Sequence, residues 1–184
     1  YIIIILSPLI IIYRIFKKKE NPKRFLEKFS INKGVRKKGK LIWFHCSSVG
    51  EFLSIVPLIL KFEKKKKIKQ ILVTTSTLSS SKIFEKFRFK KTLHQFYPLD
   101  NTHVINNFLN YWNPSSAVFV ESEIWPIMIS ELKERKIKIV LINARMSEKS
   151  FKKWFSIKSF GKKILEKFDY IFPQNKETFL YFKR

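Results

Sequence analysis

Two glutamates stand where a short apolar run gives way to an amphipathic one. Glu51 closes the segment that begins with residues 41–45, and Glu121 directly follows residues 117–120. Ligands of open α/β sheets bind in the crevice outside the carboxyl ends of the strands, so acids at these positions are expected to face a site. A glutamate with an ordinary pKa near about 4.3 is ionised at neutral pH and can accept a proton or stabilise a developing cation.

Both acids also have a structural interpretation that the sequence leaves open. Unpaired backbone N–H groups and the helix dipole favour a carboxylate at the start of any helix. Glu51 can therefore be an ordinary first-turn acid, and Glu121 a helix cap. Glu123 is predicted to lie in the first turn of a helix that has Pro126 near position N1.

Polar residues follow the other predicted strands as well. Residues 74–81 are rich in hydroxyl groups and enter a helix, which suits either an anion cradle or simple N-capping, and they lack the P-loop pattern. Arg145 can hold a phosphate or a carboxylate through two hydrogen bonds, or form an ordinary surface ion pair. His45 is predicted to be a packing or hydrogen-bonding group rather than a base.

The sequence favours chemistry without a metal. Cys46 is the single cysteine, which excludes an intrachain disulfide and, with three scattered histidines, argues against a zinc site. Asp100 and Asp169 are the only aspartates, so the chain has no Asp-x-Asp motif for metal-dependent sugar transfer. We therefore expect neither a metal nor another cofactor.

Six short apolar runs without polar alternation are typical of parallel strands that are covered on both faces. Amphipathic stretches separate these runs, so strand and helix alternate as in right-handed βαβ units. The expected fold class is α/β, a Rossmann-like parallel sheet with helices on both faces, which would bring the polar clusters to one edge. Pro57 is awkward in the first helix, because an interior proline loses a hydrogen bond. The predicted strands are residues 41–45, 71–75, 93–97, 117–120, 137–142 and 170–172.

The N-terminal residues 1–13 are almost wholly apolar, and Arg14 and the lysines 17–19 follow them. As a helix, thirteen residues span about 20 Å, less than the roughly 30 Å of a bilayer core. A signal peptide would carry its charges before the apolar run, so we expect residues 1–16 to be an uncleaved hydrophobic membrane anchor. The positive-inside rule then places the rest of the chain on the cytoplasmic side.

The net charge is +24, and 31 of the 38 basic residues are lysine. An AT-rich genome favours lysine, isoleucine and phenylalanine alike, and such a genome would account for the bias as well as a nucleic-acid-binding function would. The clusters at 17–19, 33–40 and 64–67 are more informative, because polybasic segments near an apolar segment are typical of contacts with anionic membranes. We expect a basic connector over 17–40, with a short helix near 25–29, and one α/β domain over 41–184.

Five segments of the chain resemble the 3-deoxy-D-manno-octulosonic acid (Kdo) transferases, which add Kdo to the lipid A precursor in Gram-negative bacteria. They occur in the family's order and with similar spacing from about Arg24 onward. The chain lacks the family's usual glycine near residues 79–81 and has Ile127 where the family carries an asparagine. The matching segments are SVGE (48–51), ILVTTST (71–77), YPLD (97–100), ESEIWP (121–126) and NARMSEKS (143–150).

The resemblance implies the N-terminal, acceptor-binding half of a GT-B glycosyltransferase, whose donor-binding C-terminal domain, needed for activity, would lie beyond Arg184. Glu51 would be the general base and Glu121 the carboxylate that stabilises the transition state. The implied reaction is inverting, takes Kdo from CMP-Kdo to the lipid A precursor (lipid IVA), and belongs to lipopolysaccharide biosynthesis at the cytoplasmic face of the inner membrane. The implied substrate-binding residues are Ser48, Gly50, Thr75, Ser76, Glu123, Trp125, Asn143 and Arg145.

Two other interpretations remain open. The lysine clusters could belong to a basic α/β module that binds nucleic acid. However, the aromatic residues lie in apolar runs and no nucleic-acid-binding motif is present, so we expect no nucleic-acid partner. The chain could also be a scaffold that binds a glycolipid without catalysis. The transferase interpretation requires Glu51 and Glu121 to share one edge of the sheet.

Overall fold

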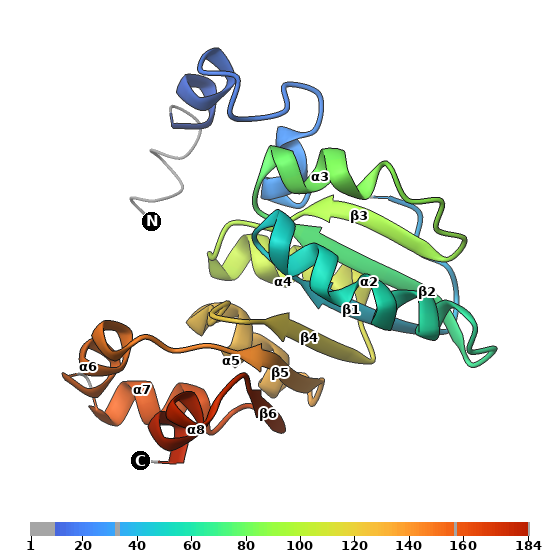
Figure 1. Cartoon of the computed structure of the whole chain (residues 1–184). Coiled ribbons are helices and arrows are strands. Elements are labelled where there is room, and N and C mark those ends of the chain that lie inside the picture. Colours follow the sequence, from blue (N-terminus) through green and yellow to red (C-terminus); the bar gives the residue numbers. More distant parts are fainter. Residues whose placement is uncertain (1–9, 32–33, 157, 184) are drawn as a thin grey trace.

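A six-stranded parallel sheet forms the centre of the computed structural model, which describes residues 10–31, 34–156 and 158–183 (Figure 1). The strand order is β3-β2-β1-β4-β5-β6, so the sheet runs outward in both directions from the β1–β4 pair. This is the order of a doubly wound Rossmann sheet, and the predicted fold class is confirmed. The strands are β1 (Lys40–His45), β2 (Ile68–Thr75), β3 (Thr92–Phe96), β4 (Ser116–Val120), β5 (Lys138–Ala144) and β6 (Tyr170–Pro173), each within three residues of its predicted bounds.

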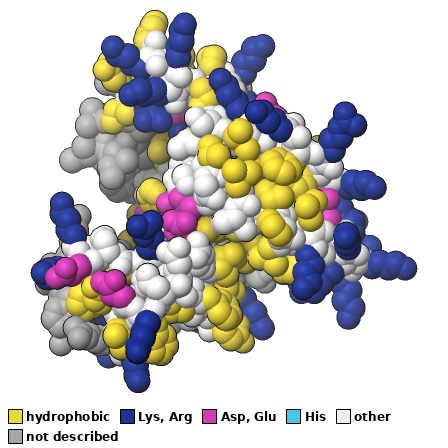
Figure 2. All heavy atoms as spheres, viewed as in Figure 1, with side chains coloured by type: hydrophobic (Ala, Val, Ile, Leu, Met, Phe, Trp, Pro, Cys, Tyr) yellow, Lys and Arg dark blue, Asp and Glu magenta, His cyan; other side chains and the backbone are white. Residues whose placement is uncertain are grey.

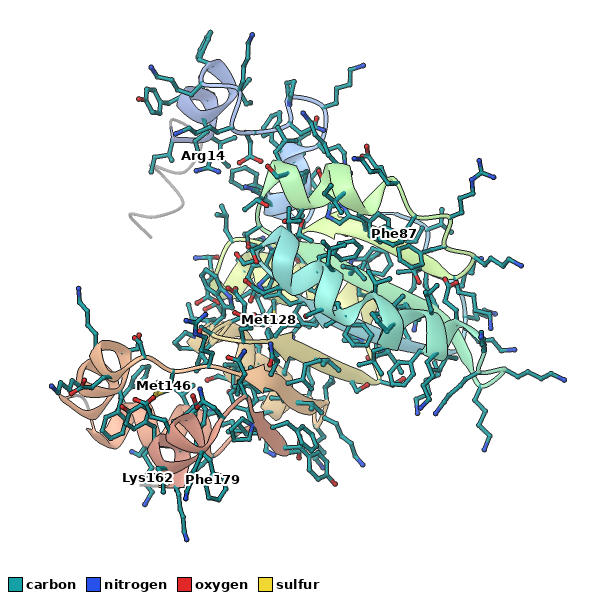
Figure 3. All side chains as sticks on the ribbon, in the orientation of Figure 1. Arg14, Phe87, Met128, Met146, Lys162 and Phe179 are labelled. Carbon is teal, nitrogen blue, oxygen red and sulfur yellow. The ribbon has the colours of Figure 1, made fainter. Side chains whose placement is uncertain are left out.

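Helices cover both faces of this sheet. Side chains of α2 pack in one core, and side chains of α4, α5 and α7 pack in the other. Phe87 packs against the first core and Met128 lies in the second; both are labelled in Figure 3. The helices are η1 (Phe25–Phe29), α2 (Val49–Glu63), α3 (Leu78–Phe84), α4 (Thr102–Trp112), α5 (Pro126–Glu134), α6 (Glu148–Ser156), α7 (Lys158–Leu165) and α8 (Lys176–Lys183).

Strand β1 shows why the apolar runs lack polar alternation. Successive side chains of a strand point to opposite faces. Leu41 and Trp43 enter the core beneath α4 and α5, whereas Ile42 and Phe44 enter the core beneath α2. Both faces are buried, so every position from Leu41 to the end of the strand must be compatible with an interior.

Pro57 does not interrupt α2. The helix continues from Val49 to Glu63, and Pro57 lies on its exposed side. The carbonyl that loses its partner there can be hydrated, which removes much of the cost of an interior proline.

The segment predicted as a basic connector, residues 17–40, packs against the domain. The predicted short helix is η1, and Leu99 donates its backbone N–H to the Lys28 carbonyl at 2.9 Å. Lys28 also forms a buried ion pair of 2.6 Å with Glu20, and the Arg36 guanidinium binds the carbonyl of Trp112 at 2.7 Å. Several of the segment's charges therefore stabilise the fold.

The predicted anchor lies mostly outside the described residues, which begin at residue 10. Residues 10–16 are helical, and Ile10, Tyr13 and Phe16 expose more than half of their surface. No helix within the described ranges has both the length and the apolar character needed to cross a membrane.

Phe119 in β4 provides a test of the central core. It is fully buried, with its ring centroid 5.4 Å from that of Trp43 and 6.3 Å from that of Phe168. Phe119→Ala should lower the free energy of unfolding by about 3–5 kcal/mol, because it removes a buried ring and leaves a cavity. Urea denaturation of the chain measures this loss.

The matched control is Phe16→Ala, which removes a ring that is 81% exposed. Its free energy of unfolding should change by no more than about 0.5 kcal/mol. Equal losses in the two variants would contradict the central position of Phe119.

Candidate active site

The candidate site lies where the sheet reverses its winding direction. β1 pairs in parallel with both β2 and β4, so the loops that follow β1 and β4 leave neighbouring strands at the same edge. Figure 2 shows acidic side chains gathered at this carboxyl-end edge, on the left of the view. The structure therefore brings together the two loops that carry Glu51 and Glu121.

Glu51 lies in the first turn of α2 and is fixed there by helix capping. The Ser48 hydroxyl accepts the backbone N–H of Glu51 at 3.2 Å, and Glu51 Oε2 accepts the backbone N–H of Ser47 at 2.8 Å. This is a variant of the capping box, so the structural interpretation of Glu51 is confirmed. This capping role is compatible with a catalytic one, because Oε1 of Glu51 has no hydrogen-bond partner among the described residues. The space next to Glu51 is also open: Gly50 is exposed, and the nearest atom to a Cβ added there would be Ser48 Oγ at 4.0 Å.

Glu121 directly follows β4 in a conformation that glutamate rarely adopts. Its φ is +58°, and Asn143, at the corresponding place on β5, has a φ of +51°. A left-handed conformation costs a residue other than glycine about 1–2 kcal/mol and, away from helix ends and turns, is a reason to look for a functional role. Backbone hydrogen bonds hold it, because the Glu121 N–H donates to Ile142 and the Glu121 carbonyl accepts from the Arg145 N–H. Glu121 is thus a strained residue at the end of β4, beside β5, and it is not the cap of α5.

Glu123 lies in the loop before α5, so the prediction that it occupies the first turn of a helix is wrong. The helix begins at Pro126, which occupies the predicted first position, with Trp125 as the N-cap. Glu123 Oε2 accepts hydrogen bonds from His45 Nε2 at 2.9 Å and from Trp125 Nε1 at 2.8 Å. His45 is fully buried and is a hydrogen-bonding group, as predicted.

The carboxylates of the site influence one another's protonation. Burial raises the pKa of Glu121, and the negative charge of Glu51 raises it further, while Arg145 lowers it. Burial alone would also raise the pKa of Glu123. The hydrogen bond from His45, the charge of His45 and the hydrogen bonds from Trp125 and Ser47 outweigh this effect, so the pKa of Glu123 is lowered. The site therefore combines Glu123, which resists protonation, with Glu121, which is protonated more readily than an ordinary glutamate.

The hydroxyl-rich segment after β2 contributes less directly. Thr75 is buried, and its hydroxyl bonds with His94 Nε2 at 2.9 Å, so it faces the interior. Thr77 is the N-cap of α3, which supports the capping interpretation, and the Ser80 hydroxyl donates to the Ser47 carbonyl at 3.2 Å. Ser76, between them, is half-buried.

Arg145 and Asn143 flank Glu121 from the end of β5. Arg145 is exposed, and its guanidinium forms no ion pair with any described residue. The Asn143 side-chain amide approaches Glu121 Oε1 at 3.4 Å. Arg145 is therefore available to bind an anion. This fits the first of its two interpretations, an anion-binding residue, better than the second, an ordinary surface ion pair.

The sequence did not indicate two structural roles. Ser47 holds Glu51 through its backbone N–H, which no side-chain pattern could reveal. Asp100 accepts the backbone N–H of Met128 at 3.2 Å, so this acid of the YPLD segment satisfies the start of α5. Within the described residues, no three histidine, cysteine or acidic side chains cluster as a metal site would require.

The fold and the position of the site define a GT-B-like Rossmann domain. The chain is similar to the UDP-GlcNAc 2-epimerase of Neisseria meningitidis bound to UDP-GlcNAc, with a TM-score of 0.54 and 11% identity over 78% of this chain and 43% of that one. A second UDP-N-acetylglucosamine 2-epimerase matches with a TM-score of 0.53 and 13% identity over 79% of this chain and 42% of that one. These likenesses concern the fold.

Sequence comparison identifies the family. The family model of 3-deoxy-D-manno-octulosonic-acid transferase (kdotransferase) matches residues 23–184. The 3-deoxy-D-manno-octulosonic acid transferase of Rickettsia felis is 43% identical over 73% of this chain and 29% of its own length. A probable mitochondrial 3-deoxy-D-manno-octulosonic acid transferase of Arabidopsis thaliana is 39% identical over 82% of this chain and 34% of its own length. The chain belongs to the Kdo transferase family and spans about a third of the length of these relatives.

The coupling of the two candidate acids can be measured directly. In Glu51→Gln, the pKa of Glu121 should fall towards its ordinary value, because a neighbouring negative charge is removed. In Arg145→Gln it should rise, because an attractive positive charge is lost. NMR titration of the glutamate carboxyl carbons in the chain would show both shifts. An unchanged Glu121 titration in both variants would mean that the acids do not share a site.

Proposed function

We propose that this chain supplies the acceptor-binding half of an inverting glycosyltransferase that moves Kdo from CMP-Kdo to the lipid A precursor. The observation that carries the proposal is the placement of Glu51 and Glu121 on adjacent loops at the switch point of the sheet, in a member of the Kdo transferase family. Ligands of doubly wound sheets bind at that place. The donor would bind to a second domain of the kind that GT-B enzymes carry.

In this proposal, Glu51 takes the proton of the acceptor hydroxyl while the oxygen of that hydroxyl bonds to the anomeric carbon of Kdo. The bond from that carbon to the phosphate of CMP breaks on the opposite face, which inverts the centre. Oε1 of Glu51 is the accepting atom, because Ser47 engages Oε2. Proton transfer to a positioned base typically accelerates a reaction by about 10²–10⁴-fold.

Glu121 has a different role in the same step. Its half-buried carboxylate lies close enough to Glu51 for their charges to interact, so it can face positive charge that develops on the sugar ring. The exposed Arg145 beside it suits a phosphate of the lipid acceptor. Gly50 and Ser48 leave the approach to Glu51 open, because both are exposed.

We also propose that the protein acts at the cytoplasmic face of the inner membrane. Residues 10–16 expose isoleucine and aromatic side chains directly before the exposed lysines 17–19. Apolar side chains next to a basic cluster suit the surface of an anionic bilayer. The lysines 64–67 are also exposed, but they lie beyond the far end of α2, on the right of Figure 1, away from Glu51.

The catalytic proposal is tested in a protein that joins this chain to its donor-binding domain. Glu51→Gln should lower Kdo transfer from CMP-Kdo by at least about 100-fold while folding is unchanged, because the amide cannot accept the proton. Transfer to lipid IVA can be followed by mass spectrometry of the product. Glu134→Gln, an exposed acid at the end of α5, is the control and should retain full activity. Turnover retained in Glu51→Gln would refute the assignment of the base.

The membrane proposal predicts different effects for two lysine clusters. Replacing the lysines 17–19 with glutamine should weaken binding to anionic liposomes and reduce its salt dependence, at about 1 kcal/mol per charge. Replacing the lysines 64–67 should weaken binding less, because α2, the helix that precedes this cluster, buries most of its apolar side chains in the core. Sedimentation with liposomes at several salt concentrations measures both effects. Binding that does not respond to either replacement would contradict a membrane contact through these clusters.

A further inference from the structure

Glu123 lies at the end of a chain of hydrogen bonds that connects β1, β2 and the loop after β4. Trp43 Nε1 donates to Thr74 Oγ1 at 2.9 Å, and Thr74 Oγ1 lies 3.0 Å from His45 Nδ1. His45 Nε2 lies 2.9 Å from Glu123 Oε2, which also accepts Trp125 Nε1–H. The chain therefore links the central core to the loop between β4 and α5.

The groups involved limit the direction of these hydrogen bonds. A carboxylate only accepts, so His45 Nε2 carries a proton when it faces Glu123. His45 Nδ1 lies 3.0 Å from the Thr74 hydroxyl and 3.2 Å from the Thr74 carbonyl, so it has a partner whether or not it carries a proton. Thr74 Oγ1 receives the indole N–H of Trp43 and can donate to the Phe44 carbonyl at 3.4 Å. A satisfied buried network holds its members in one arrangement. The ring of His45 is further fixed by stacking on Tyr97, with centroids 3.8 Å apart.

The loop that carries Glu123 is held on its other side as well. The Ser122 hydroxyl donates to the Arg145 carbonyl at 2.7 Å, which ties the loop to the end of β5. Glu123 ties it to the end of β1 through His45. Glu121 lies between these two attachments and β4, and the attachments add to the backbone hydrogen bonds with β5 that hold its positive φ.

We propose that Glu123 is a positioning residue that acts through His45 and Trp125: it fixes the 121–125 loop so that the strained Glu121 stays opposite Glu51, and it does not itself contact the acceptor. The Glu123 side chain is only 15% exposed and the His45 side chain is fully buried, whereas Arg145 and Gly50 are open to solvent. The catalytic consequence rests on the proposed function; the structural role does not.

The charged and titratable groups around Glu123 come from four elements. Glu51 lies in the first turn of α2, and Glu121 follows β4. His45 ends β1 and Cys46 follows it, and Tyr97 and Asp100 follow β3. Burial raises the pKa of Tyr97 and of Cys46, so both are neutral at pH 7. The carboxylate of Glu123 is therefore the negative charge that His45 meets directly.

The first test is spectroscopic and uses the chain itself. A buried imidazole N–H that donates to a carboxylate exchanges slowly and should give a separate downfield proton resonance, assigned to His45 by ¹⁵N labelling. In Glu123→Ala this resonance should disappear, whereas Glu123→Gln should retain it with an upfield shift, because the amide oxygen still accepts. Glu134→Ala is the control and should leave it unchanged. A resonance that persists unaltered in Glu123→Ala would overturn the proposed contact.

The second test separates positioning from substrate binding in the protein joined to its donor-binding domain. For Glu123→Ala we expect kcat to fall by about 100-fold, the effect of misplacing a catalytic group by about 1 Å, while KM for the acceptor changes by less than about threefold. Glu123→Gln should recover most of the lost kcat. A rise in KM with kcat unchanged would show that Glu123 binds the acceptor and would overturn the proposal.

The two tests fail in different ways. If the unaltered protein transfers no Kdo, the proposed function is wrong, and the His45 resonance still reports whether Glu123 holds the loop. If Kdo transfer occurs but Glu123→Ala has the kinetics of the unaltered protein, the proposed function stands and the positioning role is wrong.

Discussion

The parallel pairing of β1 with β4 is the contact on which both the core and the candidate site depend. It places Trp43 against Phe119 on one face of the sheet and gives the two faces separate apolar cores. Because both strands run in the same direction, the same pairing brings the loops that follow them to one edge. The interaction that stabilises the sheet therefore also fixes the distance between the loops that carry Glu51 and Glu121.

The site is built from groups that also have structural duties. Glu51 caps α2 through one oxygen and leaves the other without a partner among the described residues. Glu121 has a strained backbone conformation, and hydrogen bonds with Ile142 and Arg145 of the neighbouring chain segment hold it. A structural and a catalytic interpretation of the same carboxylate are compatible here, because a helix cap and a β-strand end both restrict a side chain to one geometry. Such restriction is what a general base requires.

The net charge of +24 is not distributed as one binding surface. Arg24, Lys28 and Arg36 are engaged by Glu27, Glu20 and backbone carbonyls, so part of the basic N-terminal segment belongs to the fold. Lysine and arginine side chains project over much of the visible surface, and acidic side chains form smaller patches between them, as Figure 2 shows. An anionic acceptor would thus meet a positive surface outside the site and carboxylates within it. A general attraction of this kind speeds association more than it determines specificity.

The sequence by itself determined the fold class, the six strands and the edge that carries the candidate residues, because short apolar runs that alternate with amphipathic stretches are typical of parallel strands buried on both faces. The first-turn position of Glu51 and the N1 position of Pro126 followed from the local preferences of helix N-termini for acidic residues and proline. Only the tertiary structure decided what Glu123 does, because its partner His45 is 78 residues away and the loop conformation depends on both. The burial of Thr75 and the left-handed backbone of Glu121 were likewise set by strand pairing, which brings together groups whose separation in the sequence carries no signal.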